Sequence, residues 1–105
     1  MTLRVAVITL LGAGALVSGE GAVPRRHVVE IRGMAFAPAV LRVARGDTVI
    51  WVDRDIVPHT ATAPGAWDTG TLVQEERGVI VSRRPGRLEY GCRLHPTMKA
   101  TLVTR

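Results

Sequence analysis

The sequence predicts an all-β domain, built as an antiparallel sandwich or barrel. Three observations lead to this fold class. Short runs rich in β-branched residues alternate between apolar and polar positions. Glycine and proline interrupt these runs at frequent intervals. Beyond the N-terminal apolar run, no window shows the sustained 3.6-residue period of an amphipathic helix.

The N-terminus has the features of a secretory signal peptide. Arg4 supplies its positive start, residues 5–17 form an apolar run, and small residues follow. We expect a signal peptide over residues 1–21, with cleavage between 19 and 22, and a single domain over residues 22–105. The apolar run is too short for a membrane span, which needs about 20 residues. We therefore expect a periplasmic protein without a stable membrane span, although a buried helix or an anchor would be alternative interpretations.

The expected strands follow in order along the chain, and turn residues separate them. Gly33 ends the first strand, residues 45–47 form a turn before the third, and residues 84–87 form a turn before the fifth. Residues 53–74 are the longest stretch without a clear strand, and such stretches often carry function. The predicted strands are residues 27–31, 40–44, 48–52, 79–82, 88–92 and 101–103.

Composition limits the possible sources of stability and the possible partners. The chain has 105 residues and one cysteine, so its stability must come from packing, a metal, or both. Its net charge of +5 arises from an excess of arginine over acidic residues. Export and few aromatic residues argue against nucleic acid. A basic surface facing an acidic protein or an anionic membrane fits better, and an ordinary solvated arginine-rich surface fits as well.

A cluster of soft ligands near the C-terminus indicates a metal site. Cys92, His95 and Met98 lie in the sequence GCRLHPTMKA, and their donor atoms suit copper better than calcium, magnesium or manganese. Two histidines, one cysteine and a weak axial methionine form the ligand set of electron-transfer copper sites. The second histidine must be His27 or His59. We expect His27 to face solvent at the start of the domain, and His59 to complete the site.

Other interpretations of these residues stay open from the sequence. Cys92 could be a buried structural thiol, or a nucleophile with a histidine as its base. The second interpretation leaves Met98 unexplained, and no oxyanion stabiliser is recognisable. Zinc could bind two histidines and a cysteine, but a thioether is a poor zinc ligand. Met34 could add a soft ligand, although packing with Phe36 in the core explains it better.

These residues give the chain its resemblance to cupredoxins of the plastocyanin/amicyanin family, the type 1 blue copper proteins. The segments that carry it are MAFAPAVLRVARGDTVIWVDRDIVPHT, WDTGTL and YGCRLHPTMKATLV, and it extends over residues 32–103. The Cys-x-x-His-Pro-x-Met loop is short, as in amicyanin. The resemblance implies a Greek-key β-sandwich of about eight strands and one copper ion that alternates between Cu(I) and Cu(II).

The resemblance also implies a role for each ligand. His59, Cys92 and His95 would bind copper in one plane, with Met98 as the axial ligand, and His95 would reach the surface within an apolar patch. The implied function is electron transfer rather than enzymatic catalysis. The protein would be a monomer that shuttles single electrons between a redox protein donor and acceptor. The alternative is a periplasmic copper carrier or delivery protein that uses the same four residues.

Three further residues bear on this interpretation. Arg93 and Lys99 flank the ligand loop and could form a basic rim that steers a partner with an acidic docking surface, or could be ordinary solvated charges. Asp53 stands where the family commonly has an asparagine whose side chain holds the cysteine-bearing loop. An ionised carboxylate accepts hydrogen bonds but cannot donate them, and a charged Asp53 would favour Cu(II) and lower the potential.

Overall fold

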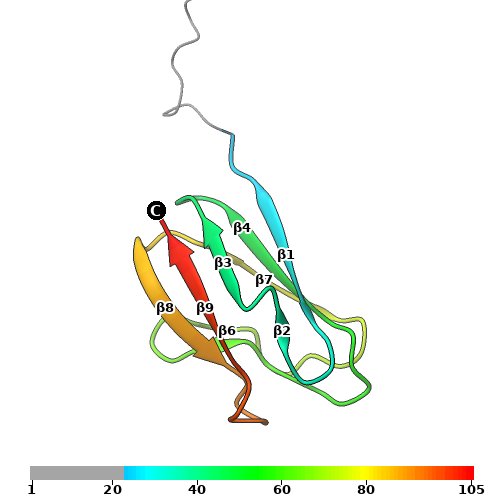
Figure 1. Cartoon of the computed structure of the whole chain (residues 1–105). Helices are drawn as coiled ribbons and strands as arrows, with labels where there is room; N and C mark the ends of the chain where they lie inside the picture. The colour runs from blue at the N-terminus through cyan, green and yellow to red at the C-terminus, as the bar shows by residue number, and fades with distance from the viewer. Residues whose placement is uncertain (1–22) are drawn as a thin grey trace, which may run out of the picture.

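A computed structural model of the protein describes residues 23–105, in which nine strands form two sheets packed face to face (Figure 1). One sheet has the order β2-β1-β4-β7 and the other has the order β3-β9-β8-β5-β6. The predicted signal peptide lies outside the described residues. The strands are β1 (Arg26–Ile31), β2 (Phe36–Ala37), β3 (Val40–Val43), β4 (Thr48–Asp53), β5 (Thr62–Ala63), β6 (Trp67–Asp68), β7 (Arg77–Val81), β8 (Gly86–Gly91) and β9 (Lys99–Thr104).

The predicted β-sandwich is confirmed, and each of the six predicted strands overlaps an observed one. Two features differ from the prediction. The sheets are mixed rather than antiparallel, because β1 pairs in parallel with β4 and β3 with β9. The two-residue strands β2, β5 and β6 were not predicted, because alternation cannot be recognised over two residues. No helix in the described part of the chain is long and apolar enough to cross a membrane.

Aromatic side chains fill the centre of the sandwich and join its two sheets. Trp51 of β4 is fully buried, and its indole N–H donates a hydrogen bond of 3.1 Å to the hydroxyl of Tyr90 on β8. The Trp51 ring also stacks on Trp67, with ring centroids 5.6 Å apart, and Phe36 contacts Tyr90 edge to face. Such pairs contribute more than their buried area alone. Because Tyr90 is two residues before Cys92, this packing fixes the end of β8.

A buried carboxylate organises the turn before β4. Asp47 accepts hydrogen bonds of 2.9 Å from the backbone N–H groups of Arg25 and Ala44, and contacts Nε2 of His27 at 2.9 Å. The two backbone bonds, followed by the His27 contact, lower the pKa of Asp47 to about 2. The expectation that His27 faces solvent was therefore wrong, since its side chain is only 22% exposed and packs against Asp47. This turn ties the start of β1 to the start of β4.

We expect Asp47→Asn to lower the free energy of unfolding by about 2 kcal/mol at neutral pH, since one pKa unit corresponds to about 1.4 kcal/mol. The folded pKa of about 2 lies below the ordinary value of 3.8. The ionised carboxylate therefore stabilises the fold at pH values above its ordinary pKa. This stabilisation is lost as the pH falls towards the pKa of the folded protein. Urea unfolding of the metal-free protein over this pH range measures it.

The exposed Glu89→Gln variant is the matched control, and its free energy of unfolding should stay close to that of the unchanged protein. If Asp47→Asn lowers the free energy of unfolding by the same amount at low and neutral pH, the charge of Asp47 does not stabilise the fold.

Candidate metal centre

A tight loop carries three of the four predicted ligands. β8 ends at Gly91 and β9 begins at Lys99, so residues 92–98 connect paired neighbouring strands. Gly91 is required at this point, because a Cβ there would lie 2.7 Å from the carbonyl oxygen of Met98. The Met98 N–H donates a hydrogen bond of 3.0 Å to the His95 carbonyl, which closes the loop into a turn. The loop therefore holds Cys92, His95 and Met98 close together.

His59 approaches the same point from the segment between β4 and β5, which connects the two sheets. It forms a backbone bridge with Leu72, with N···O distances of 3.0 and 2.7 Å, and is fully buried. Its Nε2 lies 2.9 Å from a carboxylate oxygen of Asp55. Asp55 also accepts hydrogen bonds from the N–H groups of Gly33 and Met34, at 2.7 and 2.9 Å. Asp55 thus connects the turn between β1 and β2 to His59 and orients its ring.

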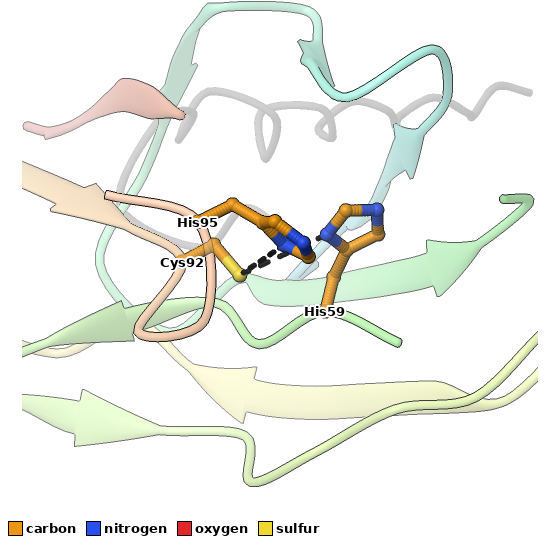
Figure 2. A group of neighbouring side chains, drawn as sticks. All are labelled: His59, Cys92 and His95. Carbon is orange, nitrogen blue, oxygen red and sulfur yellow. Dashed lines mark hydrogen bonds between the residues drawn. The ribbon is translucent and has the colours of Figure 1, made fainter. Parts of the chain in front are cut away.

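The structure brings His59, Cys92 and His95 together (Figure 2). The sulfur of Cys92 lies 3.8 Å from Nδ1 of His59 and 3.7 Å from Nδ1 of His95. Figure 2 shows both imidazoles turned towards this sulfur. Met98 is 3% exposed and lines a cleft together with Cys92. Met34 is 43% exposed, so the expected packing in the core was wrong for this residue.

The distances within this cluster fit a metal ion bound between the three side chains. Metal–sulfur and metal–nitrogen bonds of about 2.3 and 2.05 Å, separated by about 120°, place sulfur and nitrogen about 3.8 Å apart. A tetrahedral angle would shorten this separation to about 3.55 Å. The observed distances of 3.8 and 3.7 Å are those expected of donor atoms that share one metal ion. The described residues can therefore hold the ion without moving their donor atoms far.

The electrostatics of the cluster favour a thiolate. Burial acts to raise the pKa of Cys92, but the hydrogen bond from the Thr60 N–H, at 3.3 Å, and the side-chain contacts with His59 and His95 outweigh it and lower this pKa to about 6. Burial acts to lower the pKa of His59, but its contacts with Cys92 and Asp55 prevail and raise it. Since the thiolate is the form that binds metals, the site is prepared for a soft metal ion near neutral pH.

Thr60 is the functional residue that sequence reasoning missed. Besides the contact of its N–H with sulfur, its hydroxyl oxygen accepts a hydrogen bond of 2.9 Å from the N–H of Arg93, the residue after Cys92. Thr60 is fully buried and directly follows His59. It therefore connects the two loops that carry the candidate ligands. Its position beside a predicted ligand was the only available signal, because nearly every residue type supplies a backbone N–H donor.

Among the described residues, the Asp53 side chain makes no hydrogen bond to the loop that carries Cys92. Asp53 is fully buried, and one of its oxygens accepts a hydrogen bond of 2.8 Å from the N–H of Asp55. Its other oxygen has no hydrogen-bond partner among the described residues. Burial is the main cause that raises the pKa of Asp53. Asp53 thus supports the segment that precedes His59, whereas Thr60 holds the loop that carries Cys92.

The predicted basic rim beside the ligand loop is weaker than the sequence suggests. Nε of Arg93 lies 2.9 Å from a carboxylate oxygen of Asp68, so its charge is largely compensated. Lys99 is exposed at the start of β9. Exposed apolar residues are instead present in the loops that carry His59 and His95, with Ile56 84% exposed and Leu94 44% exposed.

Comparisons with known proteins agree with this architecture. No protein-family model matches the chain. Amicyanin from Paracoccus denitrificans is 28% identical over 82 residues, which cover 72% of this chain and 63% of that protein. A solved Cu(I) structure of an amicyanin variant has a TM-score of 0.71 and 25% identity, covering 74% of this chain and 80% of that chain. A purple cupredoxin from Nitrosopumilus maritimus has a TM-score of 0.69 and 20% identity, covering 75% and 99% of the two chains.

We expect the thiol of Cys92 to titrate in the metal-free protein with a midpoint at about pH 6, well below the ordinary value of 9.0. The ultraviolet absorption of the thiolate measures this midpoint, and Cys92→Ser supplies the blank. His59→Gln should raise the midpoint because it removes a hydrogen bond to the sulfur. A midpoint near the ordinary value in the unchanged protein would contradict the electrostatic account of the site.

Proposed function

Because the chain is a cupredoxin of the amicyanin type, we propose that it is a type 1 copper protein that carries single electrons between redox proteins. His59, Cys92, His95 and Met98 would hold one copper ion. The observation that carries this proposal is the convergence of two imidazole nitrogens on one buried sulfur, at 3.8 and 3.7 Å, from two separate loops.

The donor set fits copper in both of its valences. Thiolate and thioether are soft ligands that suit Cu(I), and imidazole also suits Cu(II). Bound copper would supply a one-electron couple between these two states. Zinc makes no use of a thioether, so the placement of Met98 in the cleft beside Cys92 supports copper over zinc.

The residues around the ligands keep the site rigid. Asp55 orients His59, Thr60 holds the Cys92 loop, and Gly91 allows that loop to close tightly against Met98. Donor atoms held in this way move little when the charge of the ion changes. A small rearrangement lowers the barrier to electron transfer, so this second layer of contacts supports a redox role.

His95 is the proposed point of electron exit. It is partly exposed, whereas His59 is fully buried. The side chains of Leu94 and Ile56, on the loops that carry these two histidines, are exposed and would contribute apolar surface. Such a surface suits a brief encounter with a redox partner. The partners would be a donor and an acceptor protein in the periplasm, with this protein acting as a monomer.

The alternative functions receive less support. A nucleophilic Cys92 would need open space at its sulfur, but Cys92 is only 4% exposed and its sulfur already contacts His59, His95 and the Thr60 N–H. We therefore propose that the protein is not an enzyme. A copper delivery protein must release its ion readily. The burial of His59, Cys92 and Met98, none more than 4% exposed, favours retention of the ion.

Titration of the purified protein with Cu(II) tests the proposal. We expect one equivalent to produce an intense visible thiolate-to-copper band, and voltammetry to show a reversible one-electron wave. Cys92→Ser should abolish the band, whereas the control His27→Gln should retain it, because His27 packs against Asp47 instead. Absence of the band in the unchanged protein would refute the copper site. A band with rapid loss of Cu(I) to a chelator would favour copper delivery.

We expect Asp53→Asn to raise the reduction potential, by on the order of 50 mV for one buried charge near the ion. A negative charge at this fully buried position stabilises Cu(II) relative to Cu(I). Arg84→Gln removes an exposed charge from the turn between β7 and β8, away from the candidate ligands, and should leave the potential nearly unchanged. Voltammetry of the copper-loaded proteins makes the comparison, and an unchanged or lower potential for Asp53→Asn would contradict a charged Asp53.

A further inference from the structure

Arginine residues gather at the end of the sandwich opposite the metal centre. At this end β1, β4 and β8 begin and β3 and β9 finish, and Figure 1 shows it at the top, with the loop between β8 and β9 at the bottom. Within the described residues, Asp47 is the acidic side chain at this end, and it is buried. The arginines, all exposed, are Arg25, Arg26, Arg42, Arg45, Arg83, Arg84, Arg87 and Arg105.

A cleft of about 490 Å³ lies within this basic end. Its walls include Arg25, Arg42, Arg45 and Arg105, together with Asp47. Both carboxylate oxygens of Asp47 are engaged, by two backbone N–H groups and His27. No ion pair among the described residues involves any of these four guanidinium groups. The cleft therefore carries a net positive charge, because four guanidinium groups outnumber the single carboxylate side chain of Asp47.

The metal-centre end has the opposite character. There Glu30 forms ion pairs with both Arg32 and Arg54. Arg54 also pairs with Glu75. Arg93 pairs with Asp68. The fold thus neutralises most basic residues near the candidate ligands and leaves the net positive charge of the chain at the far end. This separation is not visible in the overall charge of +5, because it arises from the strand register.

The chemistry and extent of the basic end indicate its partner. Guanidinium groups match phosphate geometry and bind it with paired hydrogen bonds. The exposed arginines extend beyond the cleft, which suits an extended anionic surface better than a single small anion. Val23 and Pro24 line the same cleft, so the chain that carries the apolar run of residues 5–17 enters the domain at this end. The predicted signal peptide would bring this end next to a membrane during export.

We propose that the basic end docks on the phosphate headgroups of an anionic membrane, with the cleft as its principal phosphate site. In this orientation His95 and the apolar surface around it face away from the lipid. Docking would confine the protein to the membrane plane and leave the metal-centre end free for its partners. The proposal needs no bound metal, so it stands or fails independently of the proposed copper function.

Vesicle binding tests this proposal with the protein as recovered after export. Phosphatidylcholine vesicles with and without phosphatidylglycerol are compared in low and moderate salt. Each basic residue near an anionic surface contributes about fivefold to binding. We therefore expect Arg42→Gln with Arg45→Gln to weaken binding to the anionic vesicles by roughly 25-fold. Added salt should weaken binding of the unchanged protein, because it screens exposed charges.

The matched control is Arg32→Gln with Arg77→Gln, which removes the same charge from the metal-centre end and should leave most of the binding intact. Arg83→Gln with Arg84→Gln is a second variant of the basic end, and should also weaken binding. Urea unfolding confirms that each variant is folded. Equal loss in the control and basic-end variants would overturn the proposal, since total charge alone would then explain binding.

Two further outcomes would also overturn it. One is the absence of any preference of the unchanged protein for anionic vesicles. The other is binding of soluble glycerol phosphate, abolished by Arg42→Gln with Arg45→Gln, in a protein that does not bind vesicles. That result would identify a free phosphate compound as the ligand. Displacement from anionic vesicles by millimolar glycerol phosphate would support the cleft as the shared phosphate site.

Discussion

The buried sulfur of Cys92 is the constraint on which the rest of the site depends. A thiolate that is 4% exposed must be stabilised by hydrogen-bond donors, because burial alone favours the neutral thiol. Those donors come from the segment between β4 and β5 and from the loop between β8 and β9. The negative charge of the Cys92 thiolate is therefore stabilised only when the two sheets are packed together. The metal centre is in this sense a product of the whole sandwich.

The same contacts keep the cluster in one arrangement. The fold orders two imidazoles and a thiolate from two separate loops around one point, which costs conformational entropy. Asp55 offsets this by binding His59 and two backbone N–H groups, and the packing of Trp51 on Tyr90 secures the end of β8. Packing of the core thus holds the candidate ligands in an arrangement that the loops alone would not adopt.

The sequence singles out the candidate ligand loop because three donors lie close together in the chain, and it favours His59 because few histidines compete for the role. It does not predict Thr60, whose contact with sulfur uses a backbone N–H that any residue except proline supplies. The resemblance does not point to Thr60 either, because it links the hold on the Cys92 loop to the side chain at position 53, whereas the observed contacts come from Thr60. The parallel pairing of β1 with β4 was missed because period-two patterns do not encode strand direction.

Separation of charge between the two ends also bears on how the metal-centre end meets other proteins. A strongly charged docking surface speeds encounter but makes it sensitive to salt and selective for the opposite charge. Here Arg93 is paired with Asp68, and exposed apolar side chains such as Ile56 are present near the candidate ligands. We therefore expect contact with a redox partner at this end to depend mainly on burial of apolar surface, which salt screens little. The arginines at the far end can attract a membrane without drawing the same surface towards His95.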